Sequence, residues 1–122
     1  MESIFVVDDD INFCNILSEE LNDAGYKTNY FSREENVVKH LKDNKTNLML
    51  LDLSMTDKDD FEIQNELNSW SGCPTKTIIL TAYSNERSAI KSARLGASDY
   101  ICRPYEINDL LISIKKVLQN QP

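Results

Sequence analysis

Acidic side chains follow two separate apolar runs in this sequence. Three consecutive aspartates, which begin at Asp8, follow residues 4–7, and Asp52 follows residues 48–51. If both runs are strands of one parallel sheet, their carboxyl ends meet at the edge where open α/β sheets bind ligands. The spacing therefore predicts that carboxylates from distant parts of the chain share one site.

Carboxylates grouped in this way favour chemistry that uses a divalent cation. Asp8, Asp9 and Asp52 would bring like charges together, and these repel one another unless a cation neutralises them. A hard ion with oxygen ligands suits such a site, and Mg²⁺ leaves coordination positions open for a phosphoryl oxygen. Since one carboxylate can then act as a nucleophile, the group predicts phosphoryl transfer.

Two further strand ends add a hydroxyl and a cation. Thr81 follows residues 78–80, and Arg103 follows residues 100–102. Each of these residues, taken singly, has an ordinary structural explanation, and Asp10 in particular stands where a helix N-cap is expected. Because they occur together at successive strand ends, a functional edge of the sheet is the favoured interpretation.

The elements that must position these residues are alternating strands and helices. Apolar runs alternate with segments whose apolar residues recur every three or four positions, which is typical of a parallel sheet covered on both faces. The predicted strands are residues 4–7, 27–31, 48–51, 78–80 and 100–102. The predicted helical segments are residues 14–24, a segment that begins at the capping box of Ser32 and Glu35, and residues 63–70, 90–96 and 107–118. A loop at residues 56–60 is predicted before the segment 63–70.

Length and charge restrict the possible functions. The chain has 122 residues, which is enough for one domain, and its net charge of −7 disfavours direct binding to nucleic acid or anionic membranes. The N-terminus shows no signal-peptide or transmembrane pattern. The scattered cysteines, Cys14, Cys73 and Cys102, predict reduced thiols in the cytoplasm. The polar end at residues 119–122 leaves open both a complete protein and a piece of a longer one.

Several short segments give the chain its resemblance to a known family. They are Val6-Val7-Asp8-Asp9-Asp10, Leu50-Leu51-Asp52-Leu53-Ser54-Met55, Ile79-Leu80-Thr81-Ala82, Gly96-Ala97-Ser98-Asp99-Tyr100 and Arg103-Pro104. In this order and spacing, residues 1–122 resemble the receiver domain of two-component response regulators, and the chemotaxis-regulator type in particular. The resemblance implies a flavodoxin-like (βα)5 fold of the α/β class. This fold is a three-layer sandwich around a parallel five-stranded sheet in the order 2-1-3-4-5.

The resemblance also implies roles for the residues at the strand ends. Asp52 would be the phospho-acceptor, and Thr81 and Arg103 would contact the phosphoryl group. The metal site, for Mg²⁺ or Mn²⁺, would consist of Asp8, Asp9, Asp52 and the backbone carbonyl of Ser54. Thr81 and Tyr100 would form the switch that reshapes a surface made by the fourth and fifth helices and the last strand.

The resemblance implies partners as well. The phosphoryl donor would be a sensor histidine kinase or a histidine phosphotransferase, and the target would be a downstream protein or effector domain. The chain would be a cytoplasmic signalling protein, either a monomer or a phosphorylation-dependent dimer, with no direct contact to nucleic acid or membrane. It would not be an enzyme beyond self-directed phosphotransfer and autodephosphorylation.

The sequence departs from the family pattern at four positions. Arg103 replaces the usual lysine, and a planar guanidinium differs in shape from a compact ammonium. Thr56 and Asp57 stand where the family has Pro-Gly, and Asp60 replaces a glycine, so this loop is more acidic. These departures motivate an alternative, a pseudo-receiver that binds a partner and never takes phosphate.

A second alternative is a phosphatase. Asp8 and Asp10 are similar to the first acidic pair of haloacid-dehalogenase enzymes, but Asn12 stands where that motif has Thr or Val. Asp52 would also have no role in such an enzyme. The remaining residues with useful chemistry, His40 and Trp70, are interpreted as packing residues, with a surface position also open for His40.

Overall fold

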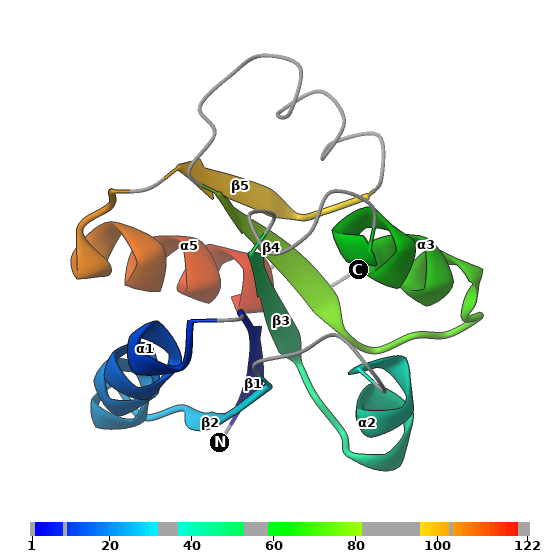
Figure 1. Ribbon diagram of the computed structural model, residues 1–122, viewed down its shortest axis with the longest axis horizontal. Helices are drawn as coiled ribbons and strands as arrows, with labels where there is room; N and C mark the ends of the chain where they lie inside the picture. Colours follow the sequence, from blue (N-terminus) through cyan, green and yellow to red (C-terminus); the bar gives the residue numbers. More distant parts are fainter. Residues whose placement is uncertain are drawn as a thin grey trace.

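The computed structural model of the chain describes residues 2–8, 10–31, 37–52, 59–81, 96–102 and 104–119. Its centre is a parallel five-stranded sheet in the order β2-β1-β3-β4-β5 (Figure 1). The strands are β1 (Ser3–Val7), β2 (Lys27–Phe31), β3 (Leu48–Asp52), β4 (Lys76–Thr81) and β5 (Asp99–Cys102). The strand positions predicted from the apolar runs are confirmed, and so is the strand order that the resemblance implied.

Among the described residues, three helices connect consecutive strands and a fourth follows β5. They are α1 (Ile11–Asp23), α2 (Val37–Asp43), α3 (Asp59–Ser69) and α5 (Ile107–Gln119). The predicted helix at residues 90–96 lies mostly outside the described residues, as does the capping box of Ser32 and Glu35. Gly96, the last residue of that predicted segment, is described and has a φ of 83°.

The sequence prediction was wrong at three helix boundaries. Asp59 and Asp60 belong to α3 rather than to the predicted loop. Trp70 follows α3 instead of closing it. Ala24 is the C-cap of α1 and stands just outside the helix.

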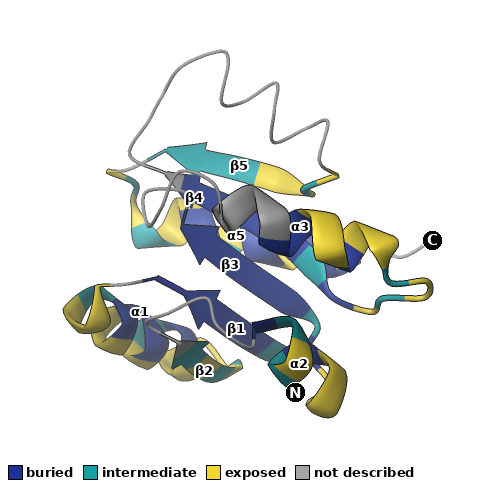
Figure 2. Ribbon diagram, turned by 45° about the vertical axis from the view of Figure 1, so that its right-hand side comes forward, coloured by how far each residue is buried: buried dark blue, intermediate teal, exposed yellow. Residues whose placement is uncertain are grey.

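Helices cover both faces of the sheet and make the fold a three-layer sandwich. α1 and α5 lie on one face, and α2 and α3 lie on the other (Figure 1). Because side chains alternate along a strand, Ile4 and Val6 pack with the first pair of helices, whereas Phe5 and Val7 pack with the second. β1, β3 and β4 are buried on both faces, as the continuous apolar runs predict (Figure 2).

The turn after α1 depends on a glycine. Gly25 has a φ of 100°, and its N–H donates a hydrogen bond to the carbonyl of Asn22 at 3.0 Å. A side chain at this position would meet no atom within 4 Å, so the requirement for glycine comes from the backbone conformation alone.

We expect Gly25→Ala to lower the free energy of unfolding by about 1–2 kcal/mol, the cost of a left-handed conformation for a residue with a Cβ. Gly25→Asn should recover part of the loss, because asparagine tolerates this region better. Urea unfolding with an unchanged denaturant slope would measure both effects. An alanine variant as stable as the parent chain would contradict the assignment.

Candidate functional site

Two aspartates predicted to act together lie at the same edge of the sheet. Asp52 is the last residue of β3, and Asp8 directly follows β1. Val7 pairs with Leu51 across these strands, so the next residues, Asp8 and Asp52, stand at the same level on neighbouring strands. Neighbouring strands are about 4.8 Å apart. Both aspartates are only 1% exposed, so the fold holds two carboxylic side chains close together and away from bulk solvent.

The turn after β1 fixes the position of Asp8. Its Oδ1 accepts a hydrogen bond from the backbone N–H of Asp10 at 2.9 Å, and its carbonyl accepts one from the thiol of Cys14 at 3.5 Å. Asp10 in turn accepts hydrogen bonds from the N–H groups of Asn12 and Phe13, each at 3.1 Å. The predicted N-cap role of Asp10 is thereby confirmed.

Thr81 and Tyr100 come to this region from the next two strands. Asp52 pairs with Leu80, which places the backbone of Thr81 one residue further along β4. Thr81 pairs with Cys102 at the end of β5, and Tyr100 pairs with Ile79 two residues earlier. Four of the five strands therefore deliver a predicted site residue or its neighbour to one edge.

The other predicted site residues, Asp9, Ser54 and Arg103, lie outside the described residues. Within the described ranges no group of three or more His, Cys, Asp or Glu forms a metal cluster. The two described carboxylates nevertheless fit a hard divalent cation such as Mg²⁺, because their donors are oxygens held in a buried position.

Tyr100 lies in a hydrogen-bonded network that the sequence analysis did not predict. Its N–H donates to Oδ1 of Asp99 at 2.7 Å, and the hydroxyl of Ser113 donates to Oδ2 of the same carboxylate. Asp99 thus connects the start of β5 to α5. The phenol of Tyr100 also interacts with the side chain of Cys102, two residues along the strand and so on the same face. The two-residue spacing of Tyr100 and Cys102 could have predicted their contact from the sequence. No local sequence pattern could have predicted the contact of Asp99 with Ser113.

Burial, and then the hydrogen bond and charge of Cys102, raise the pKa of Tyr100 to about 12. An unfolded chain would ionise this tyrosine near pH 10, so the folded state keeps its proton over a higher range. We therefore expect the contribution of Tyr100 to stability to be intact below pH 10 and to be lost as the pH rises from about 10 to about 12. Alkaline absorbance titration of the parent chain and of Tyr100→Phe would measure the raised pKa on which this loss of stability depends. If the two titration curves differ only by one phenol that ionises near pH 10, the pKa of Tyr100 is not raised and the prediction is wrong.

His40 and Trp70 have packing roles, as expected. The ring of His40 stacks on Phe5 with centroids 4.3 Å apart and an interplanar angle of 17°. Trp70 packs partly buried beside the cluster beneath α2 and α3, and the ammonium of Lys42 lies 5.5 Å from its ring centroid.

No helix among the described residues has the length and apolar character needed to cross a membrane.

Comparison with known families gives a match over most of the chain. Residues 4–115 match the family model of the response regulator receiver domain. The transcriptional regulatory protein ZraR of Escherichia coli is 29% identical over 115 residues, which are 94% of this chain and 26% of that protein. The chain thus spans about a quarter of the length of the curated relatives it matches.

Solved structures show the same similarity. The response regulator protein TrrA from Thermotoga maritima, in complex with Mg²⁺ and BeF, is 31% identical with a TM-score of 0.82, and the match covers 96% of this chain and 99% of TrrA. A CheY-like receiver domain protein from Methanospirillum hungatei is 25% identical with a TM-score of 0.87, over 98% of this chain and 94% of that one.

Proposed function

The chain belongs to the family of response regulator receiver domains, and from this premise we propose that it is a phospho-acceptor switch whose acceptor is Asp52. The observation that carries the proposal is the burial of Asp52 beside Asp8 at the carboxyl edge of adjacent strands. β1 lies between β2 and β3, so this edge is also where the strand order reverses. Ligands of open α/β sheets bind at such a point.

In this proposal a carboxylate oxygen of Asp52 attacks the phosphorus of a phosphohistidine on a kinase or phosphotransferase. The new O–P bond forms as the N–P bond breaks, and the histidine leaves with the electron pair. Thr81 would donate its hydroxyl to a phosphoryl oxygen, and Arg103 would supply a positive charge. Any catalysis is self-directed, since Asp52 of the chain itself accepts the group and later loses it by hydrolysis.

A bound Mg²⁺ or Mn²⁺ would neutralise the negative charge of the phosphoryl group and of the nearby carboxylates. The residues proposed to hold it are Asp8, Asp9, Asp52 and the backbone carbonyl of Ser54. The complex of TrrA with Mg²⁺ and BeF supports this assignment by similarity.

The proposed output runs through β5 and α5. Phosphorylation adds about 1.5 to 2 negative charges at Asp52. Drawing Thr81 toward that charge would change the space available to the ring of Tyr100. Because Asp99 hydrogen-bonds both the N–H of Tyr100 and the hydroxyl of Ser113, a change at Tyr100 would reach α5 directly. A downstream protein or effector domain would recognise the reshaped surface, with the chain as monomer or phosphorylation-dependent dimer in the cytoplasm.

The proposal is tested by incubating the chain with acetyl phosphate and Mg²⁺ and reading the intact mass. We expect the addition of one phosphoryl group, and none when the metal is removed with a chelator. If neither acetyl phosphate nor a phosphohistidine protein adds phosphate, the chain is a pseudo-receiver, the alternative that Arg103 motivates.

The phosphatase alternative finds no support in the described geometry. Asp10, the second aspartate of the pair that resembles the haloacid-dehalogenase motif, is the N-cap of α1. Its carboxylate already accepts hydrogen bonds from Asn12 and Phe13.

A further inference from the structure

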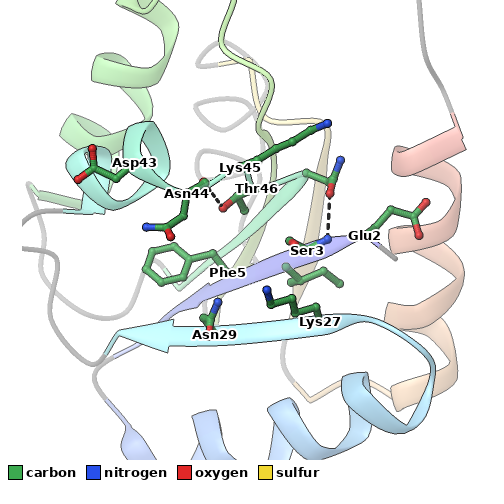
Figure 3. A pocket seen from close by; sticks show the side chains of 11 residues that line it. Glu2, Ser3, Phe5, Lys27, Asn29, Asp43, Asn44, Lys45 and Thr46 are labelled. Carbon is green, nitrogen blue, oxygen red and sulfur yellow. Dashed lines mark hydrogen bonds between the residues drawn. The ribbon is translucent and has the colours of Figure 1, made fainter.

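A polar pocket lies at the edge of the sheet opposite Asp52. Its volume is about 720 Å³, within the range of small-molecule sites. The first three residues of β1 and the first half of β2 line it together with residues 43–47, which run from the end of α2 to just before β3 (Figure 3). Since all strands are parallel, their starts and ends lie at opposite edges, and the pocket is separate from the phosphorylation site.

Basic and amide side chains stand on two walls of this pocket. Lys27 and Asn29 are two residues apart on the edge strand β2, so they project from the same face of the sheet. Lys45 stands on the opposite wall, in the turn before β3, and Figure 3 shows its ammonium directed outward, away from Lys27. All three are exposed, and the flexible stem of a lysine lets its ammonium turn over a bound molecule.

The acidic residues of the pocket leave these lysines unneutralised. Asp43 accepts a hydrogen bond from Lys39 at 2.9 Å. Figure 3 shows the carboxylates of Asp43 and Glu2 at the two ends of the pocket, directed away from its centre. Within the described part of the chain, no hydrogen bond or ion pair joins the side chains of Lys27, Asn29 or Lys45 to another residue. Two lysines and two acidic residues thus line the cavity, and one of the acidic residues, Asp43, already pairs with Lys39.

Other polar groups of the pocket are already occupied, and this gives the cavity a defined shape. The Oδ1 of Asn47 accepts from the N–H of Ser3 at 2.9 Å, and the hydroxyl of Thr46 donates to the carbonyl of Asn44 at 3.0 Å. Thr46 is buried, and its own carbonyl accepts from the hydroxyl of Thr75 at 2.8 Å. The wall is thus held by long-range contacts, whereas the lysines and Asn29 remain available to a ligand.

We propose that this pocket binds a small organic anion whose carboxylate or phosphate group lies between Lys27 and Lys45. The two ammonium groups balance the charge of the ligand, and the amide of Asn29 contacts a polar group beside it. Such a site gives the domain a second input that does not depend on phosphorylation of Asp52.

The test uses the full ¹⁵N-labelled chain without Mg²⁺, titrated with citrate in one series and with inorganic phosphate in another. We expect saturable amide shifts at Ser3, Lys27, Asn29 and residues 44–47, with Asp8 and Asp52 unaffected. Saturation by citrate alone identifies a carboxylate site, and saturation by phosphate alone a phosphate site. Lys27→Gln and Lys45→Gln should each weaken binding about tenfold, as the loss of a charge-assisted hydrogen bond predicts.

Lys116→Gln is the matched control, because it makes the same charge change at an exposed position of α5 outside the pocket. Its affinity should equal that of the parent chain. Shifts that never saturate, or equal weakening by Lys116→Gln, would show general charge screening and overturn the proposal. Repeating the titration with Asp52→Asn should give the same affinity, so failure of the phosphorylation proposal would leave this result unchanged.

Discussion

Asp52→Asn is expected to abolish phosphoryl uptake from acetyl phosphate, taking it from one group per chain to none. The amide has nearly the shape of the carboxylate but lacks a nucleophilic oxygen anion. Asp52 is 1% exposed at the end of a strand buried on both faces, where there is little room for a larger side chain. Because asparagine has nearly the same shape, the change should leave the fold intact. Intact mass spectrometry after incubation with Mg²⁺ and acetyl phosphate measures the uptake, and circular dichroism checks the fold.

Asp23→Asn is the matched control for this loss. Asp23 is the exposed last residue of α1 and lies at the other end of that helix from Asp8. The same chemical change there should leave uptake at one phosphoryl group. Full uptake by a folded Asp52→Asn chain would mean that another side chain is the acceptor, and the proposed role of Asp52 would be wrong.

Local sequence patterns were sufficient to predict the strands of this fold. Residues 4–7 and 48–51 are too short for helices and too apolar for a surface, so burial inside a parallel sheet was the natural solution. The strand order could not be predicted in this way, because periodicity does not say which strands are neighbours. It came from the resemblance to receiver domains, and the observed pairing of β1 with both β2 and β3 confirms it.

The helix boundaries show where local patterns end. Asp59 and Asp60 are equally plausible in a loop and in the first turn of a helix, since both positions favour acidic residues. The stripe that includes Trp70 has helical spacing, but α3 ends at Ser69 and the ring still reaches the core from the bend that follows. Packing of a large side chain therefore does not require that its own residue be helical.

The residues of the site also include some that the sequence could predict and some that it could not. Asp8 and Asp52 could be predicted, because their positions follow from the ends of strands that the sequence itself marks. The link from Asp99 to Ser113 could not, because it joins residues 14 positions apart through the packing of α5 on the sheet. The roles of Asp9, Ser54 and Arg103 stay predictions, since these residues lie outside the described ranges.

The two buried carboxylates should make the fold respond to metal, and Asp8→Asn tests this directly. We expect the variant to bind Mg²⁺ about 10- to 100-fold more weakly, the usual cost of losing a group that assists metal ligands. Without metal it should be more stable than the parent chain by roughly 1 kcal/mol, because a neutral amide replaces one of two neighbouring buried acidic side chains. The hydrogen bond from the N–H of Asp10 to Oδ1 is retained, since asparagine keeps that acceptor.

Thermal unfolding with and without Mg²⁺ measures both effects of Asp8→Asn. A ligand that binds only the folded state raises the unfolding temperature with its concentration, so the parent chain should gain stability from Mg²⁺ at lower concentrations than the variant. Asp23→Asn should behave as the parent chain does, because its exposed carboxylate is far from the edge that holds Asp52. A variant that loses stability without metal, yet keeps the full response to Mg²⁺, would show that Asp8 serves the turn after β1 and has no part in a metal site.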